Sequence, residues 1–340
     1  MKIIIQQWNG IGDFILTLPT LEALRKVFKT SRLYLEVPHP VLPLAERLPL
    51  ADSIKPLGDH KKQKGSFDLA IVFTYASLPH ELEKRADRLC EITFEDFAGK
   101  NCHMSRFLFN KVFRLLRKGK IVTRTPRFEW PHLVLPATIL EKGKKKMRRL
   151  LGSVDSRSII KIALHPGAGF SHKCWPIDNF AAVIRWLSET ETCQLFIVSG
   201  PGDRAKEKEL KKLLGAGAKK KNLHWIRNQP LADLAGLIKQ CDLYLGNDSG
   251  ISHIAGALRV PTVCIFGPMG PGAWGPYGAH NIVLFKSNDE IECQRCDYFK
   301  MPQCRDKRCL ELITVDEVKQ AIGYQLNRII RRALQALKVI

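Results

Sequence analysis

The sequence predicts an α/β protein made of two consecutive domains, each a parallel sheet wound with helices on both faces. Its 340 residues are enough for two ordinary hydrophobic cores. Strand-like runs alternate with helix-like runs, which is typical of βαβ units and parallel sheets. The alternation begins anew after a polar break at 153–156, which predicts domains at 1–155 and 156–340. Since ligands bind beyond the carboxyl ends of such strands, two domains placed face to face would form a binding cleft.

Each element of the first half has its own signal. A β-rich run at 2–6 predicts the first strand, and apolar residues at helical spacing after a glycine turn predict a helix at 15–28. The fully apolar run at 69–73 is typical of a strand in a parallel sheet that is covered on both faces. Further strands are expected at 32–37 and 133–135, and further helices at 104–116 and 137–151.

The second half repeats this pattern. Strands are expected at 159–164, 195–198, 243–245 and 260–266, and helices at 177–188, 203–214 and 231–239, with another helix that begins near residue 250. The last expected element, at 315–337, is a basic amphipathic helix. Glycine-containing turns join several of these strands to the helices that follow, so these turns are the places to look for ligand-binding groups.

The charge of the chain indicates an anionic partner. Lysine and arginine number 54 against 33 acidic residues, a formal charge of +21, and such a field attracts polyanions. The basic run at 142–149 fits a solvated helix face and a membrane-facing patch equally well. No nucleic-acid-binding module is recognisable, so no nucleic acid partner is expected. The short apolar start does not resemble a signal peptide, and no run is long enough to span a bilayer, so a cytoplasmic location is expected.

Two glycine turns carry candidate catalytic groups. The turn at 8–13 ends in Asp13, where the first helix begins, so Asp13 is either a helix cap or a general base. The turn at 165–176 combines glycines with Lys173, a composition that suits a phosphate, although an ordinary loop between strand and helix would look the same.

Two further turns carry candidate nucleotide-binding groups. Asp203, in the turn at 199–203, could accept hydrogen bonds from a ribose or could only cap the next helix. In the turn at 246–257, Asp248 and Ser249 precede a helix of small residues that begins near Gly250. The positive end of that helix could hold a pyrophosphate, with His253 about one turn further on.

This last turn resembles glycosyltransferase family 9, the lipopolysaccharide heptosyltransferases. The likeness rests on DSGISHIA at 248–255 and VPTVCIFGP at 260–268, and similar motifs occur in the same order at 12–19, 166–176 and 200–203. The resemblance implies a GT-B fold, with the acceptor on domain 1–155 and the nucleotide on domain 156–340. It also implies inverting, metal-independent transfer of a heptose from ADP-heptose to the inner core of lipopolysaccharide, an anionic glycolipid at the inner membrane surface. Peripheral binding of the enzyme to that membrane is left open.

The resemblance also assigns roles to single residues. Asp13 would be the catalytic base, and Lys173 would neutralise the leaving diphosphate with help from Ser171. The groups expected around the diphosphate and sugar are Asp248, Ser249, Gly250 and His253. Asp203 would meet the nucleoside. Since the chain lacks an Asp-x-Asp pair that could hold a metal on the phosphates, the lysine and the helix terminus would replace one.

Four clustered cysteines form a separate candidate site within the loop at 293–309. Cys293, Cys296, Cys304 and Cys309 have a spacing that could bind zinc or iron tetrahedrally. Such a metal would be structural, and reduced surface thiols are the other interpretation.

Other functions remain open because the chain departs from the family pattern in two places. It has QQWN at 6–9, where the family often has a basic residue, and Met269-Gly270, where threonine and aspartate are usual. One alternative is a transferase that uses another nucleotide sugar or a protein acceptor. Another is a sugar-nucleotide epimerase on the same scaffold, and a third is a metal-clamped binding protein without catalytic activity.

Overall fold

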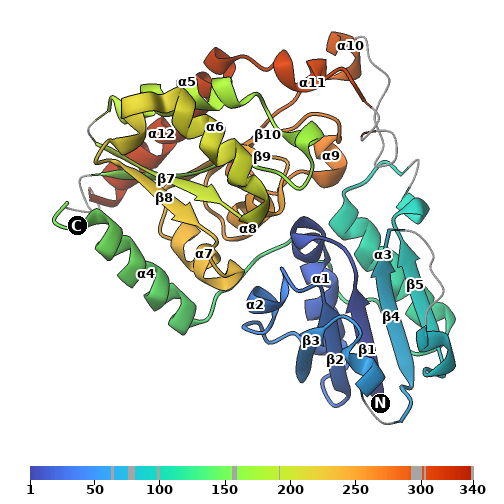
Figure 1. Cartoon of the computed structure of the whole chain (residues 1–340). Coiled ribbons are helices and arrows are strands. Elements are labelled where there is room, and N and C mark those ends of the chain that lie inside the picture. Colours follow the sequence, from blue (N-terminus) through green and yellow to red (C-terminus); the bar gives the residue numbers. More distant parts are fainter. Residues whose placement is uncertain are drawn as a thin grey trace. The chain divides into compact units, whose positions relative to one another are not determined.

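The computed structural model describes residues 1–62, 65–75, 81–97, 100–154, 159–190, 192–291, 301 and 304–337. The chain forms two compact units (Figure 1). The N-terminal unit comprises Met1–Pro136 with Pro230–Ala232, and the C-terminal unit comprises Ala137–Gln229 with Asp233–Ile340. The division therefore follows residue 136, whereas the sequence placed it after residue 155.

Close helix packing explains why the helix before the expected boundary belongs to the C-terminal unit. Helix α4 (Ala137–Leu151) lies against α7 (Leu231–Ile238) at two glycines, Gly143 and Gly236. A Cβ atom on Gly143 would stand 2.1 Å from the carbonyl oxygen of Gly236, so the two backbones touch. Lys142 adds an ion pair with Asp233 at 3.8 Å.

The N-terminal unit contains, among its described residues, one parallel sheet with the strand order β3-β2-β1-β4-β5. The strands are β1 (Lys2–Gln7), β2 (Arg32–Val37), β3 (Ser53–Pro56), β4 (Leu69–Thr74) and β5 (Leu89–Thr93). The helices are α1 (Ile11–Val27), α2 (Leu42–Ala45) and α3 (Met104–Lys118), of which α1 and α3 pack together. Residues 133–135 do not form the expected strand. Leu133 and Leu135 are buried, but they do not pair with the sheet.

The C-terminal unit contains, within the described part, a parallel sheet with the order β11-β10-β9-β6-β7-β8. The strands are β6 (Ile160–His165), β7 (Cys193–Ser199), β8 (Leu223–Arg227), β9 (Leu243–Asn247), β10 (Thr262–Ile265) and β11 (Asn281–Leu284). The remaining helices are α5 (Ile177–Ser188), α6 (Arg204–Leu214), α8 (Gly250–Ala257), α9 (Pro271–Trp274), α10 (Asn288–Ile291), α11 (Arg308–Glu311) and α12 (Val315–Leu337). Helices α5, α6 and α12 cover one face of the sheet, and α7 and α8 cover the other (Figure 1).

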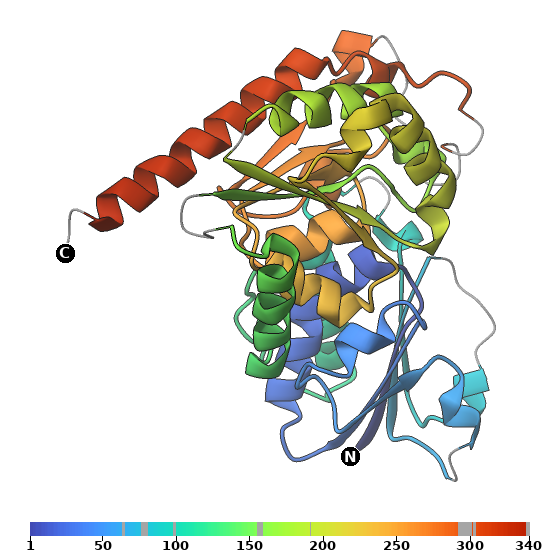
Figure 2. The ribbon, with the colours of Figure 1, turned by 60° about the vertical axis from the view of Figure 1, so that its left-hand side comes forward.

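The C-terminal helix is amphipathic, as its sequence predicts. Val318 and Ile322 are fully buried in the core beneath α5 and β10, whereas Ile330 and Leu334, further along, are exposed. The later turns of α12 extend beyond the sheet (Figure 2). None of the helices in the described ranges has the length and hydropathy that a membrane crossing requires.

Both sheets have a central point where the winding reverses. In the N-terminal unit, β1 lies between β2 and β4, and in the C-terminal unit β6 lies between β7 and β9. At such a point the loops after neighbouring strands diverge and leave room for a ligand at the carboxyl edge. The glycine turns at 8–13, 165–176 and 246–257 all fall at these two points.

Candidate functional site

A buried histidine joins three loops at the carboxyl edge of the C-terminal sheet. His165 is the last residue of β6 and lies only 5% exposed. Its Nδ1 atom is 3.2 Å from Ser249 Oγ, and its Nε2 atom is 3.1 Å from Asp203 Oδ2. Two of the predicted ligand-binding residues are therefore brought together by a histidine that was not among the predicted site residues.

An asparagine at the end of β9 fixes the glycine turn that follows β6. Asn247 is fully buried, and its side-chain oxygen accepts a hydrogen bond from the backbone N–H of Trp175 at 3.0 Å. Its amide nitrogen donates to the carbonyls of Pro166 at 2.9 Å and Gly167 at 3.3 Å. Asn247 thus ties both ends of the turn that carries Lys173. The sequence places it at the end of a strand, but that position alone did not reveal this role.

Helix α8 begins where the sequence predicts, at Gly250. Ser249 caps it, because its hydroxyl accepts a hydrogen bond from the Ser252 N–H at 3.4 Å. The Ser252 hydroxyl in turn donates to the carbonyl of Asn247, so the turn between β9 and α8 is internally bonded. His253 lies one turn into the helix and is buried. The N–H groups of the first turn give this end of the helix a positive character that suits an anion.

The predicted phosphate-binding lysine forms an ion pair with the predicted aspartate. Lys173 Nζ lies 2.8 Å from Asp248 Oδ2, and their side chains are 17% and 5% exposed. The buried Oδ2 atom has no hydrogen-bond partner among the described residues, so Lys173 is the group that compensates its charge. A buried carboxylate is costly unless it is paired. Lys173 therefore lies partly exposed at the carboxyl edge of the sheet. An incoming anion would compete with Asp248 for its ammonium group. Ser171, two residues earlier, is exposed.

Asp203 both caps its own turn and holds His165. Its Oδ2 atom accepts a hydrogen bond from the Gly200 N–H at 2.8 Å in addition to the contact with His165. Burial alone would raise the pKa of Asp203, but the hydrogen bond and charge of His165 outweigh it and hold the pKa below its ordinary value. A Cβ atom on Gly167 would stand 2.0 Å from Asp203 Oδ1, so only glycine fits there.

Asp13 lies in the first turn of α1, where its carboxylate is held by the N-cap residue Gly10 and by a tyrosine. Its Oδ2 atom accepts hydrogen bonds from the Gly10 N–H at 3.0 Å and from the Tyr75 hydroxyl at 2.7 Å. Tyr75 follows β4 directly and packs edge-on against Phe94, with ring centroids 4.8 Å apart. The two donors fix the orientation of the carboxylate. Tyr75 was missed from the sequence, because no pattern connects it with a residue 62 positions away.

The residues that replace the family's usual basic residue are mostly buried at the end of β1. Gln6 donates to Glu36 Oε2 at 2.7 Å, and Glu36 also contacts His60 Nδ1 at 2.9 Å. The side-chain amides of Gln7 and Asn9 are buried, and none of their atoms has a hydrogen-bond partner among the described residues. The residues at 6–9, which depart from the family pattern, therefore lie mostly in the interior of this turn.

The predicted metal site falls mostly on undescribed residues. Cys293 and Cys296 lie outside the described ranges. Cys304 and Cys309 are described and half-buried, and the Cys304 thiol donates to the carbonyl of Asp306 at 2.7 Å. Within the described part, no group of three histidine, cysteine, aspartate or glutamate side chains could hold a metal. Nothing in that part supports zinc or iron, and the site stays a prediction.

Comparison with known proteins agrees with this architecture. The model of glycosyltransferase family 9 (heptosyltransferase) matches residues 136–301, starting at the boundary between the two units. Lipooligosaccharide heptosyltransferase 2 of Campylobacter jejuni is 25% identical over 341 residues, which cover 95% of this chain and 98% of that protein.

Two solved structures share the fold over nearly the whole chain. A glycosyltransferase of family 9 from Veillonella parvula superposes with a TM-score of 0.76 at 22% identity, covering 96% of this chain and 98% of that one. The ADP-heptose lipopolysaccharide heptosyltransferase II of Escherichia coli gives 0.69 at 19% identity, covering 96% and 99%. The predicted GT-B-type α/β architecture is confirmed. With its two wound parallel sheets, its ordered motifs and these relatives, the chain is similar over nearly its whole length to proteins of glycosyltransferase family 9.

Proposed function

We propose that this chain is an inverting glycosyltransferase that moves a heptose from ADP-heptose to the inner core of lipopolysaccharide. The names of its full-length relatives support this substrate class. The observation that carries the proposal is the junction of His165, Asp203 and Ser249 beside the Lys173–Asp248 ion pair, at the point where the C-terminal sheet reverses its winding. The enzyme would act in the cytoplasm, at the inner membrane surface.

The C-terminal unit would hold the donor. The diphosphate would lie at the first turn of α8, next to Gly250, within reach of Lys173 and the Ser171 hydroxyl. His253 would contact the diphosphate or sugar, and Asp203 the nucleoside. Negative charge grows on the diphosphate as the bond to the sugar breaks. Lys173 would stabilise that charge by exchanging its contact with Asp248 for the phosphate oxygens. These groups supply positive charge from the chain itself, which supports a metal-independent reaction.

Asp13 would be the base. The acceptor hydroxyl oxygen attacks the anomeric carbon of the heptose from the side opposite the diphosphate. The carbon–oxygen bond to ADP breaks, and the proton of the hydroxyl passes to the Asp13 carboxylate, so the anomeric configuration inverts. Because Gly10 N–H and Tyr75 O–H hold the carboxylate through Oδ2, Tyr75 would be a positioning residue for this step.

The central test is release of ADP by the purified protein when it is given ADP-heptose and a lipopolysaccharide core acceptor. Asp13→Asn keeps an oxygen that can cap α1 but cannot take the proton, so kcat should fall about 10²-fold to 10⁴-fold while ADP affinity stays unchanged. The matched control is Asp87→Asn at an exposed carboxylate of the same unit, which should retain full activity. Turnover of another donor in place of ADP-heptose would contradict the proposal, as would full activity of Asp13→Asn.

Tyr75→Phe tests the positioning role separately. The ring and its contact with Phe94 remain, and the hydrogen bond to Asp13 is lost. We expect kcat to fall about tenfold while KM for the donor and the melting temperature stay the same. A parallel loss of melting temperature and activity would show that the hydroxyl only supports the fold.

A transferase of another nucleotide sugar is the second candidate. The observation that favours it is Met269, which is buried in the loop after β10 where the family usually has a polar residue. The melting temperature should be compared in the presence of ADP-, UDP- and GDP-sugars, since only the correct donor binds and stabilises the native state. A rise with a UDP- or GDP-sugar alone would favour this candidate over ADP-heptose.

A further inference from the structure

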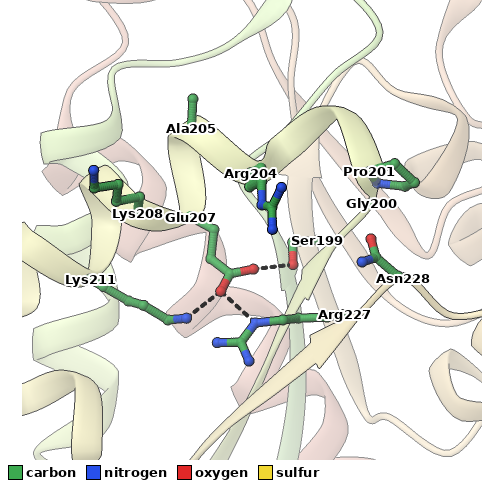
Figure 3. Close-up of a pocket in the computed structure, with 10 residues that line it drawn as sticks. All are labelled: Ser199, Gly200, Pro201, Arg204, Ala205, Glu207, Lys208, Lys211, Arg227 and Asn228. Atoms are coloured by element: carbon green, nitrogen blue, oxygen red, sulfur yellow. Dashed lines mark hydrogen bonds and ion pairs between the residues drawn. The ribbon is translucent and has the colours of Figure 1, made fainter.

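A basic pocket of about 950 Å³ lies next to the turn that carries Asp203 (Figure 3). It opens between α6, the end of β7 and the end of β8. Its lining residues are Ser199, Gly200, Pro201, Arg204, Ala205, Glu207, Lys208, Lys211, Arg227 and Asn228. The pocket shares the turn at 199–201 with the donor site, but His165, Lys173 and Asp248 do not line it.

The lining is strongly positive. Four cationic side chains line it, those of Arg204, Lys208, Lys211 and Arg227, together with one carboxylate, that of Glu207. Arg204 and Lys208 are exposed, and neither has a partner in the described part of the chain. Figure 3 shows Arg204 reaching from the first turn of α6 towards Ser199, while Lys211 and Arg227 converge on Glu207.

Glu207 organises the base of the pocket. Its Oε2 atom accepts a hydrogen bond from Ser199 Oγ at 2.6 Å, and its Oε1 atom binds Arg227 Nε at 2.5 Å and also Lys211 Nζ. Burial opposes ionisation, but these contacts outweigh it and lower the pKa of Glu207 to about 2. The carboxylate is therefore charged at every physiological pH and holds two cationic side chains in place. Arg227 uses only Nε for this contact, so its terminal N–H groups remain for another acceptor.

We propose that this pocket is a second anion site, which binds a phosphate monoester group and is separate from the site of the leaving diphosphate. The planar guanidinium groups of Arg204 and Arg227 can each bind two oxygens of one phosphate. Lys208 and Lys211 add point charges, and the volume leaves room for the rest of the ligand. The phosphate could be free in solution or belong to a lipid headgroup, and both sources present the same dianion.

Binding is tested on the full-length protein saturated with ADP, by calorimetric titration with inorganic phosphate and with pyrophosphate. The pocket variant is Arg204→Ala with Lys208→Ala, which removes the two cations that Glu207 does not hold. The matched control is Lys145→Ala with Arg149→Ala, which removes two exposed cations from α4. We expect the pocket variant to weaken phosphate binding at least tenfold and the control less than twofold.

Three outcomes would overturn the proposal. One is the absence of phosphate binding at millimolar concentration in the unaltered protein. Another is equal weakening in both variants, which would show attraction to the overall charge. The third is loss of ADP binding in the pocket variant, which would make the pocket part of the donor site. Because ADP binding and ADP release are measured separately, failure here is distinguishable from failure of the proposed transferase function.

Sedimentation with vesicles separates the two sources of phosphate. The vesicles contain phosphatidylcholine with either phosphatidic acid, which carries a phosphate monoester, or phosphatidylglycerol, which carries only a diester. Retention on phosphatidic acid that is lost in the pocket variant and kept in the control identifies a lipid headgroup. Phosphate binding in solution without such retention identifies a free phosphate. Equal retention of both variants on both anionic vesicles would show that the pocket does not recognise the monoester of a lipid.

Discussion

Replacement of Glu207 by glutamine should destabilise the C-terminal unit in a pH-dependent way. The pKa of Glu207 falls from an ordinary 4.5 to about 2 in the folded chain. Since one pKa unit corresponds to about 1.4 kcal/mol, the ionised form stabilises the fold by at most about 3.5 kcal/mol at pH 7. Lys211 and Arg227 are 32% and 51% exposed, so solvent screens these contacts. We therefore expect a loss of about 1 to 2 kcal/mol.

The sign of the pH dependence follows from the lowered pKa. A carboxylate whose pKa is lower in the folded than in the unfolded chain stabilises the fold fully above pH 4.5, and this stabilisation is lost as the pH falls towards 2. The difference in unfolding free energy between the unaltered protein and Glu207→Gln should thus be largest at pH 7 and smaller at pH 3.5. Glutamine has no charge to lose in this range.

Urea unfolding followed by circular dichroism at several pH values measures this difference. Urea is preferable to guanidinium, whose ions would screen the contacts under study. The two units can unfold separately, so their transitions should be fitted separately. Glu141→Gln, at an exposed carboxylate on α4, is the matched control and should cause no measurable change. A Glu207→Gln protein as stable as the original, or a difference that stays constant from pH 7 to pH 3.5, would refute the reasoning.

Three further substitutions test the packing of the C-terminal unit. Asn247→Ala removes the hydrogen-bond partner of the Trp175 N–H and of two buried carbonyls. The free energy of unfolding should therefore fall by about 2 to 5 kcal/mol, and ADP affinity should fall with it. Unchanged urea unfolding would contradict this expectation. Gly167→Ala places a methyl group 2.0 Å from Asp203 Oδ1, so calorimetry should show ADP binding at least tenfold weaker, and wild-type affinity would refute the tight fit. Gly143→Ala forces α4 away from α7 and should cost about 1 to 3 kcal/mol in thermal unfolding, whereas an unchanged melting temperature would show that the contact can relax.

The sequence predicts most of the fold because the hydrophobic pattern of a buried parallel sheet is local. The fully apolar run at 69–73 lies within β4, and the run at 243–245 lies within β9. The failures occur where the partner of a segment decides its structure. Residues 133–135 have the apolar composition of a strand but no neighbour to pair with. The helix at 137–151 is amphipathic, and nothing in its own residues shows that its Gly143 faces Gly236, 93 positions later in the chain.

The residues of the candidate site likewise fall into those that local sequence signals reveal and those that only the folded chain reveals. Residues within the glycine turns were recognisable because turn composition and position after a strand are local signals, and these gave Lys173, Asp203 and Ser249. The residues that hold them were not recognisable. His165 contacts residues 38 and 84 positions away, and Tyr75 contacts Asp13 across 62 positions. A single histidine at the end of a strand has many ordinary explanations, so only the folded chain reveals its partners.

The contacts of His165 explain how a site made of loops can be precise. Each loop carries at least one predicted ligand group. The histidine links the loop of Asp203 to the helix cap of Ser249, while Asn247 holds the turn that bears Lys173. The loops are therefore ordered by contacts within the unit, before any ligand arrives. Donors that are already oriented need no reorganisation when charge develops on the leaving group, and this makes each of them more effective. The buried residues that the sequence did not single out therefore allow the partly exposed Lys173 and the helix terminus to act together.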